Sequence, residues 1–252
     1  MIPEKSVIRI ERNGPNNDGL QPMELDPADF QSSLPTQNIY VYYEDASVGL
    51  TVGVWDTTTM QEKFGPYPGD EFIWVLEGHF AMLDSDGKAV RAQQNDAVSF
   101  RNGTPVSWKQ DGYLKKFIIT YLDPNAETPK IDSADAGVIV INPNSELATL
   151  KDTDPFEISG PNPLQRNHTA FTNDTGNMSV GVWDSRAMVS EMRPFPTYEF
   201  VQMLDGEIST TEENGETKTF VAGDCFLVPK GAVCSWKIEY YARKYYAVLD
   251  VA

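Results

Sequence analysis

The stretch "GPYPGDEFIWVLEG", Gly65–Gly78, returns later in the chain as "RPFPTYEFVQMLDG", Arg193–Gly206. Both copies carry two prolines separated by one residue, then a glutamate (Glu71 or Glu199), then an apolar run that ends in glycine. A shift of 128 residues converts one copy into the other. Proline lacks an N–H donor and favours an extended backbone, so we interpret the prolines as a rigid entry into the strand that carries the glutamate.

The shift of 128 residues holds without a gap from Val52 to Lys116. Further upstream, "SVIRIERN" matches "GVIVINPN" at a shift of 131 residues, so that nearly the whole chain is a duplication. This period is too long for a solenoid repeat, and each copy is therefore predicted to be a domain. We expect the domains at residues 1–124 and 125–252, joined by the polar, proline-containing linker at residues 123–137.

Each copy consists of short runs rich in valine, isoleucine and aromatic residues, separated by glycine, proline, asparagine and aspartate. This pattern predicts an all-β sandwich or barrel in each half. "DSDG" and "EENG" are predicted hairpin turns, and "DPADF" predicts a short helix with Asp26 as its N-cap and Pro27 at its first position. In the first copy the predicted strands cover residues 38–43, 50–55, 71–78, 79–90, 96–100 and 115–122.

Two motifs carry a family resemblance. Glu71 and Glu199, each followed by glycine after six residues, resemble the end of the first cupin motif, and Gly223 to Gly231 resembles the start of the second. The chain thus resembles a bicupin of the RmlC-like superfamily. It is most similar to the tryptophan-containing subfamily (Cupin_3, DUF861) that is related to ethanolamine-utilisation cupins and ureidoglycine aminohydrolases. The resemblance implies two tandem cupin jelly-roll β-barrels with pseudo-two-fold symmetry.

The chain departs from this family at the metal ligands. Metal-binding cupins place two histidines before the glutamate and a third in the second motif, but this chain has two histidines in total. The third-histidine position holds Val106 in the first copy and Cys234 in the second. We therefore expect no cofactor; the alternative is a transition metal held by Glu199 and Cys234. The two positions where the histidines are expected depend on whether three or four residues separate the nearer one from the glutamate. Before Glu71 these positions hold Tyr67 and Gly65, or Pro66 and Phe64. Before Glu199 they hold Phe195 and Arg193, or Pro194 and Met192.

Both histidines lie outside these motifs. His79 follows Gly78, and because its repeat partner is Glu207 we expect a solvent-facing strand residue. His168 aligns with Tyr40 on an early strand, where we expect a hydrogen-bonded residue of the core or rim, with a role in a pocket as the alternative.

The resemblance implies that both glutamates point into the barrels, where a carboxylate needs a partner. The sequence offers a basic residue (Lys109 or Lys237, Lys116 or Lys244, Arg193) or a tryptophan N–H. One interpretation is a glutamate locked in place for barrel geometry, and the other is a polar anchor in an aromatic ligand cavity. Burial makes Glu71 and Glu199 candidate acids or bases, whereas a small buried thiol is the plainer interpretation of Cys234. The candidate pocket residues are Trp55, Glu71, Trp108, Trp183, Glu199, Cys234 and Trp236.

Composition limits the partners. A net charge of -17 repels phosphate backbones and speaks against nucleic-acid binding. The sequence contains no apolar run of about 18 residues, and we see no signal peptide. It has only two cysteines. We therefore predict a cytoplasmic protein without a membrane partner. A homodimer would cover the sheet edges.

We therefore predict a small-molecule-binding bicupin, which is an isomerase, hydrolase or lyase if it is an enzyme. The alternatives are an atypical metal-dependent cupin enzyme and a non-enzymatic binding or structural module.

Overall fold

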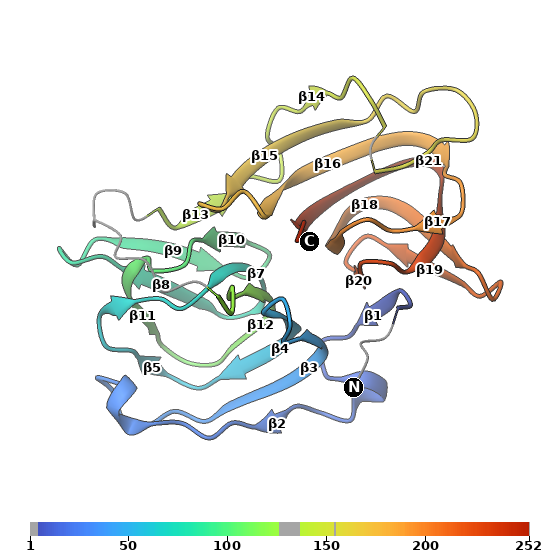
Figure 1. The fold of residues 1–252 in the computed structure, drawn as a ribbon. Helices are drawn as coiled ribbons and strands as arrows, with labels where there is room; N and C mark the ends of the chain where they lie inside the picture. Colours follow the sequence, from blue (N-terminus) through green and yellow to red (C-terminus); the bar gives the residue numbers. More distant parts are fainter. Residues whose placement is uncertain (1–4, 126–136, 154, 252) are drawn as a thin grey trace. The chain divides into compact units, whose positions relative to one another are not determined.

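The computed structural model describes residues 5–125, 137–153 and 155–251. It divides into two compact units, which are considered separately. The N-terminal unit is Glu11–Ile141, and the C-terminal unit combines Met1–Ile10 with Asn142–Ala252. Both are built from antiparallel β-strands (Figure 1), which confirms the predicted all-β class.

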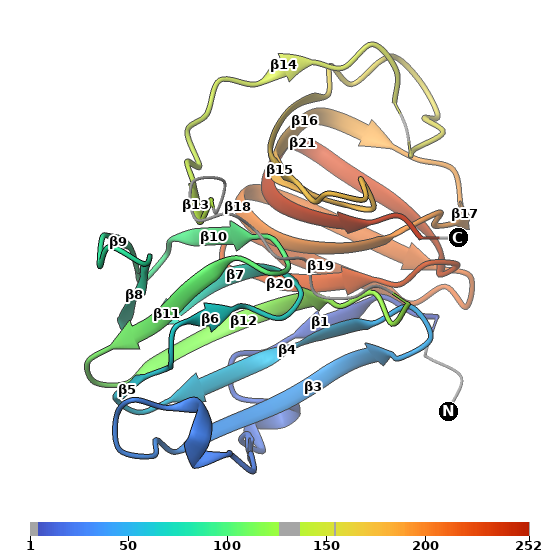
Figure 2. The ribbon, with the colours of Figure 1, turned by 60° about the vertical axis from the view of Figure 1, so that its left-hand side comes forward.

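Two sheets form the N-terminal unit. The larger has the strand order β13-β10-β7-β12-β4-β3-β2, and the smaller has the order β5-β11-β8-β9, with β6 paired to β11. Figure 2 shows β3, β4 and β12 side by side. The strands are β2 (Gln21–Pro22), β3 (Gln37–Asp45), β4 (Leu50–Thr57), β5 (Met60–Gln61), β6 (Gly65–Pro66), β7 (Asp70–Glu77), β8 (His79–Leu83), β9 (Ala89–Gln93), β10 (Ala97–Phe100), β11 (Pro105–Gln110), β12 (Leu114–Tyr121) and β13 (Ile139–Ile141).

One continuous sheet forms the C-terminal unit, in the order β1-β20-β18-β21-β16-β15-β14, with β17 paired to β21 and β19 to β18. It is continuous because β18 and β21 are long and bend at register shifts, whereas the N-terminal unit interrupts both strands. The strands are β1 (Ile8–Ile10), β14 (Ala148–Thr149), β15 (Arg166–Thr172), β16 (Met178–Val189), β17 (Arg193–Pro194), β18 (Tyr198–Glu212), β19 (Thr217–Val221), β20 (Cys225–Val228) and β21 (Val233–Leu249).

The strand order of the main sheet is the same in both units when each strand is replaced by its repeat counterpart. The first strand of each sequence copy joins the sheet of the other copy. Strand β1, from the first copy, pairs with β20 of the C-terminal unit, and β13, from the second copy, pairs with β10 of the N-terminal unit. Sequence similarity identifies these two strands as equivalent but does not reveal which sheet each one joins. The predicted domain boundary adjoins residues 126–136, which lie outside the described residues, as does most of the predicted linker; the boundary and the pseudo-two-fold symmetry stay predictions.

Local predictions are largely confirmed. The segment "DPADF" forms a 3-10 helix, η2 (Pro27–Asp29), in which the side chain of Asp26 accepts a hydrogen bond from the N–H of Ala28. A second 3-10 helix, η1 (Pro15–Asn17), was not predicted. The strand predicted over residues 79–90 is two strands, β8 and β9, joined by the predicted turn, and β11 was not among the predicted strands. Within the described part of the chain, no helix has the length and apolarity needed to cross a membrane.

Steric contacts explain why the repeated motif ends in glycine. Gly78 and Gly206 adopt positive φ angles of 80° and 73°. A Cβ atom would lie 2.1 Å from the carbonyl oxygen of Tyr113 in the first case and 2.0 Å from that of Tyr241 in the second. A side chain is therefore excluded by contact as well as by backbone conformation.

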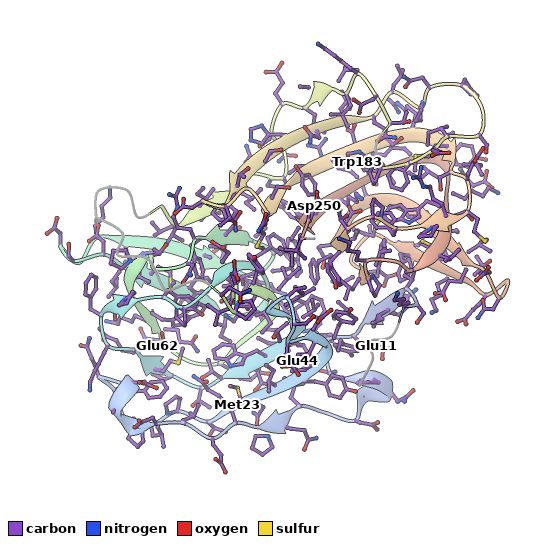
Figure 3. The ribbon with its side chains drawn as sticks, viewed as in Figure 1. Glu11, Met23, Glu44, Glu62, Trp183 and Asp250 are labelled. Carbon is purple, nitrogen blue, oxygen red and sulfur yellow. The ribbon has the colours of Figure 1, made fainter. Side chains whose placement is uncertain are left out.

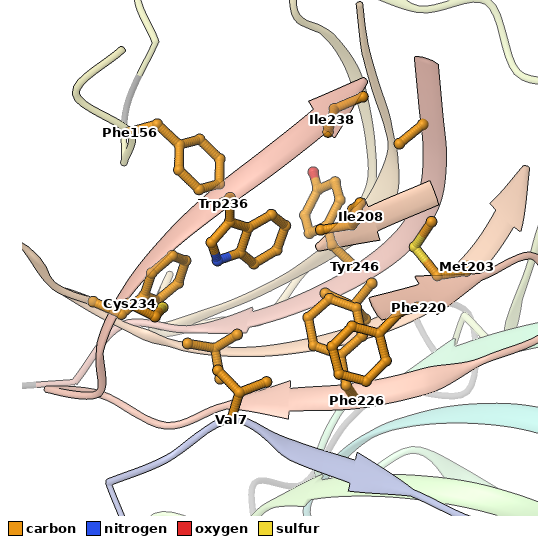
Figure 4. Close-up of a cluster of buried hydrophobic side chains, with 14 of the residues drawn as sticks. Val7, Phe156, Met203, Ile208, Phe220, Phe226, Cys234, Trp236, Ile238 and Tyr246 are labelled. Atoms are coloured by element: carbon orange, nitrogen blue, oxygen red, sulfur yellow. The ribbon is translucent and has the colours of Figure 1, made fainter. Parts of the chain in front are cut away.

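Strand alternation decides which side chains enter each core. On β7, Glu71 has the same parity as the core residues Ile73 and Val75, so all three point to one face. In the C-terminal unit Trp236 lies among aromatic rings, with ring centroids 5.0 Å from Phe156 and 5.6 Å from Phe226 (Figure 4). Each glutamate therefore enters a core that is mostly apolar.

Replacing Val7 with alanine tests whether the segment before β1 belongs to the C-terminal core. Val7 is fully buried in that core, and its N–H donates to Glu212. Removing two carbon groups and leaving a cavity should cost about 2 kcal/mol. Urea unfolding followed by tryptophan fluorescence measures this cost. Val221→Ala, the same change at an exposed position of this unit, should alter stability by less than about 0.5 kcal/mol; equal effects would contradict the assignment.

Candidate functional site

A buried ion pair lies inside the N-terminal unit. The Nζ atom of Lys116 is 2.9 Å from Oε1 of Glu71, and both side chains are about 95% buried, with 5% and 4% exposure. The same ammonium lies over two indole rings, 4.7 Å from the centroid of Trp55 and 4.4 Å from that of Trp108. The two rings and the carboxylate together replace the water that the ammonium loses on burial.

Strand pairing explains why the contact between Glu71 and Lys116 requires long side chains. Glu71 lies opposite Thr120 on β12, whereas Lys116 lies opposite Val75 on β7. The two residues are therefore offset by four positions, about 13 Å along the strands. Lys116 has the same parity as Leu114 and Ile118 of the core, so its side chain enters the interior and extends toward the carboxylate.

The C-terminal unit repeats this arrangement residue for residue. Nζ of Lys244 is 2.5 Å from Oε1 of Glu199, with 3% and 6% of the side chains exposed. It lies 4.6 Å from the ring centroid of Trp183 and 4.4 Å from that of Trp236. Burial lowers the pKa of Lys244, and the charge and hydrogen bond of Glu199 oppose this shift.

Each ion pair borders a cavity. In the N-terminal unit the cavity has a volume of about 260 Å³ and is lined by Trp55, Glu71, Trp108 and Lys116, among others. The exposed side chain of Met23, labelled in Figure 3, also lines it. In the C-terminal unit the cavity has a volume of about 300 Å³ and is lined by Trp183, Glu199 and Lys244, among others. These volumes correspond to about nine or ten water molecules, and a small metabolite is of that size.

The repeated prolines hold an aromatic residue between them in each unit, and in the N-terminal unit this residue, Tyr67, lines the cavity. Because proline has no N–H, only the residue between the two prolines can form both backbone hydrogen bonds. Tyr67 donates to the carbonyl of Thr104 and accepts from the N–H of Gly103. Phe195 is held in the same way by Ala232 and Gly231.

Tyr67 and Phe195 differ by one hydroxyl group. The hydroxyl of Tyr67 donates a hydrogen bond to Glu71. Burial, together with the charges of Glu71 and Glu62, raises the pKa of Tyr67 well above its ordinary value. Tyr67 therefore remains a neutral donor, whereas Phe195 gives Glu199 no such partner.

Glu62 was missed by the sequence analysis. Its side chain lines the N-terminal cavity together with Glu71 and Lys116. Burial raises the pKa of Glu62 to about 7; the charge of Lys116 lowers it, and those of Glu71 and Asp29 raise it further. Its repeat counterpart is Ser190, so the C-terminal unit has no equivalent carboxylate.

Neutral polar groups line part of the C-terminal cavity instead. The hydroxyl of Tyr246 is 2.9 Å from that of Thr169 and accepts a longer hydrogen bond, 3.4 Å, from the side-chain amide of Asn167. The counterpart of Tyr246 in the first copy is Ile118. The two cavities thus combine the same ion pair with different polar groups.

The residues around each glutamate do not fit the metal ion that the cupin fold implies. A lysine ammonium already lies against the carboxylate, and a divalent ion would be repelled from that position. Burial raises the pKa of the Cys234 thiol to about 11, which disfavours the thiolate that a metal requires. Within residues 5–125, 137–153 and 155–251, no group of three histidine, cysteine, aspartate or glutamate side chains is arranged to hold a metal.

The structure places the other predicted residues as follows. Among the basic candidates, Lys116 and Lys244 are the partners of the glutamates, whereas Lys109 and Lys237 are exposed. Arg193 pairs with Glu157 instead. Cys234 and Trp236 are buried, but neither lines the C-terminal cavity.

The N–H groups of Trp108 and Trp183 do not hold the glutamates. Nε1 of Trp108 donates to Gln110, and Nε1 of Trp183 donates to Gln165. His79 is exposed on β8, as expected. His168 is also exposed on β15, so of the predicted core or rim position the core position was wrong, and the rim position and the pocket role stay predictions.

One protein family model matches part of the chain. Residues 172–246 are similar to the EutQ-like cupin domain (Cupin_3). The match covers the strands that carry Trp183, Glu199, Trp236 and Lys244. No curated protein matches the chain at a significant level.

Solved structures show the cupin fold along nearly the whole chain. A Pseudomonas syringae protein of unknown function from the DUF861 family has a TM-score of 0.77 at 21% identity, covering 97% of this chain and 100% of that one. Escherichia coli Ylba, also from the DUF861 family, has a TM-score of 0.53 at 12% identity, covering 98% and 93%. Streptomyces albus HEPD, with 2-hydroxyethylphosphonate and Fe(II) bound, has a TM-score of 0.58 at 8% identity, covering 98% and 77%.

Breaking the C-terminal ion pair should be strongly destabilising. Lys244→Met leaves Glu199 buried without its partner and should lower the free energy of unfolding by about 3–5 kcal/mol. The double variant Glu199→Leu/Lys244→Met should recover most of this loss, because no buried charge remains. As a control, Arg193→Met, which breaks the exposed pair with Glu157, should cost less than about 1 kcal/mol. Chemical denaturation measures all three, and a double variant no more stable than Lys244→Met would contradict this account.

Glu62 should make stability depend on pH. Its folded-state pKa is raised from 4.5 to about 7, so the folded protein holds a proton that the unfolded chain has already released. Its contribution to stability is therefore full below pH 4.5 and is lost as the pH rises through about 7. Melting temperatures measured from pH 5 to 8 should fall less for Glu62→Gln than for the wild type. The exposed Glu24→Gln variant should keep the wild-type slope, and a wild-type slope in Glu62→Gln would contradict the raised pKa.

Proposed function

We propose that the chain binds small polar metabolites inside both cupin units, with each carboxylate–ammonium pair as the polar anchor. One observation carries this proposal: the same tryptophan, glutamate, tryptophan and lysine positions recur in both units, and each ion pair borders a cavity. Cavities that combine aromatic walls with a few convergent polar groups are typical of small-molecule sites.

The ion pairs retain capacity for further hydrogen bonds. A carboxylate accepts about four hydrogen bonds, and an ammonium donates three. Glu71 accepts from Lys116 and Tyr67, and Glu199 accepts from Lys244. Hydroxyl or carbonyl groups of a bound molecule can therefore join each pair without breaking it. This remaining capacity supports the role of a ligand anchor over that of a glutamate that only maintains the shape of the fold.

The balance of charge favours uncharged ligands. In the C-terminal cavity the Glu199–Lys244 pair has no net charge, and hydroxyl and amide groups such as those of Thr169 and Asn167 also line the cavity. The chain as a whole carries a charge of -17, which disfavours anions approaching from solution. Neutral polyols, small sugars and hydroxy-carbonyl compounds match these sites in size and polarity.

A metal-dependent activity is the less favoured alternative, because it would require Lys244 to leave Glu199 and Cys234 to ionise. A non-enzymatic binding protein would use the same cavities. Acid–base chemistry at the buried carboxylates makes the protein an isomerase, hydrolase or lyase in the enzymatic form of the proposal.

Ligand binding should depend on the two buried glutamates. Isothermal titration with a panel of glycerol, erythritol, ribose and hydroxyacetone should show saturable binding to the wild type. For ligands of the C-terminal cavity, Glu199→Gln should abolish binding, because the amide keeps the shape but loses the charge-assisted acceptor. Glu71→Gln should do the same for the N-terminal cavity.

Two further variants keep this experiment decisive. Glu157→Gln, at an exposed position of the C-terminal unit, should bind as the wild type does. Thr169→Val, which removes a hydroxyl from the wall of the C-terminal cavity, should weaken binding there even if Glu199→Gln folds poorly. Unchanged affinity in Glu71→Gln and Glu199→Gln, with wild-type circular dichroism, would contradict the anchor role.

A further inference from the structure

The two cavities differ in the groups that can exchange a proton. The N-terminal cavity holds Glu62 and Tyr67, whose repeat counterparts are Ser190 and Phe195. Glu62 adds a carboxyl group to the N-terminal cavity, beside an ion pair that the two units share. Each cavity also has one tyrosine hydroxyl, from Tyr67 in the N-terminal unit and from Tyr246 in the C-terminal unit, so the additional carboxyl group distinguishes the two sites.

The backbone at Glu62 is held firmly. Its N–H donates to the carbonyl of Trp108 at 2.9 Å, and its carbonyl accepts the hydroxyl of Ser107 at 2.6 Å. Glu62 also forms an isolated β-bridge with Phe30. The side chain of Glu62 lines the same cavity as Lys116, and the charge of Lys116 acts on its carboxyl group.

We propose that the N-terminal cavity catalyses proton transfer at the carbon next to the carbonyl group of a small, uncharged hydroxy-aldehyde or hydroxy-ketone, with Glu62 as the base. This inference rests on the proposed binding function and names the reaction and the substrate class for one of its two sites. Three groups supply the chemistry: Glu62 accepts the proton, and Lys116 and Tyr67 stabilise the charge that forms on the carbonyl oxygen.

The step balances without an oxidant or a cofactor. Glu62 takes the proton from the C–H bond, and the electron pair of that bond forms a carbon–carbon double bond. The carbonyl π electrons move to the oxygen, which becomes an enolate held by the Lys116 ammonium and the Tyr67 hydroxyl. Return of the proton from Glu62 to the same carbon regenerates the substrate. Return to the former carbonyl carbon, after a proton moves between the two oxygens, gives the isomer.

The ionisable groups of the N-terminal cavity explain why we propose an uncharged substrate and activity at neutral pH. Glu62 lines the cavity with Lys116, Glu71 and Tyr67, and the charges of Lys116, Glu71 and Asp29 act on its carboxyl group. When Glu62 and Glu71 are both ionised, Lys116 balances only one of them, so the cavity repels phosphate and carboxylate groups. Because the pKa of Glu62 is about 7, the group can act as a base at neutral pH and still return the proton.

Hydrogen–deuterium exchange measures this step directly. The full chain is mixed in D₂O with hydroxyacetone, dihydroxyacetone or glyceraldehyde, and loss of the C–H signal next to the carbonyl is followed by proton NMR. The wild type should accelerate exchange, with a rate that rises through about pH 7 as Glu62 ionises. Glu62→Gln should lower the rate by about 100-fold or more while binding the same compound with similar affinity.

Further variants separate catalysis from structure. Tyr67→Phe, which copies the C-terminal residue, should lower the exchange rate by about 10-fold and leave binding within a few-fold of the wild type. Glu62→Asp should retain part of the activity with a shifted pH profile. The exposed Glu24→Gln variant should exchange at the wild-type rate.

Each outcome decides between the two proposals. If the wild type binds at least one of the three compounds but catalyses no exchange, the proton-transfer proposal is overturned and the binding function stands. Exchange that survives in Glu62→Gln overturns the role of Glu62. If none of the three compounds binds, the substrate class is wrong and the binding function must be judged from the other neutral ligands.

Discussion

A lysine ammonium enclosed by a carboxylate and two indole rings is the interaction on which each unit depends. Removing an ammonium or a carboxylate from water costs several kcal/mol, so neither Lys116 nor Glu71 could be buried alone. Their mutual attraction offsets much of that cost, and the indole faces of Trp55 and Trp108 replace part of the lost hydration. The core around the pair must therefore supply aromatic rings at fixed positions, which accounts for tryptophans at both repeats of the site.

In each unit a lysine ammonium is the cation that contacts the glutamate. By resemblance, Glu71 and Glu199 stand where a cupin metal ligand stands, and in this chain each faces a lysine ammonium within hydrogen-bond distance. A side chain cannot supply the open coordination positions of a metal ion, but it does fix the carboxylate and leave hydrogen-bonding capacity beside it. The site is thereby suited to binding polar molecules and to proton transfer.

Much of this could be predicted from the sequence, and the remainder has identifiable physical reasons. The duplication and the strand pattern follow from spacing and composition, and the inward direction of the glutamates is what the cupin resemblance implies. The choice of Lys116 over Lys109 follows from parity, since Lys116 alternates with core residues and Lys109 is exposed beside buried Trp108. The exchange of β1 and β13 could not be predicted, because equivalent sequences fit either sheet equally well.

Glu62 shows why functional divergence is hard to see in a repeat. Shared positions such as Glu71 attract attention, whereas the residue that distinguishes the copies is one where they disagree, Glu62 against Ser190. After a duplication, the common ion pair maintains fold and binding in both units, so that one copy is free to acquire a carboxylate with a raised pKa. A raised pKa makes that unit less stable above neutral pH. A destabilising carboxylate that lines a cavity is more readily explained by chemistry than by structure.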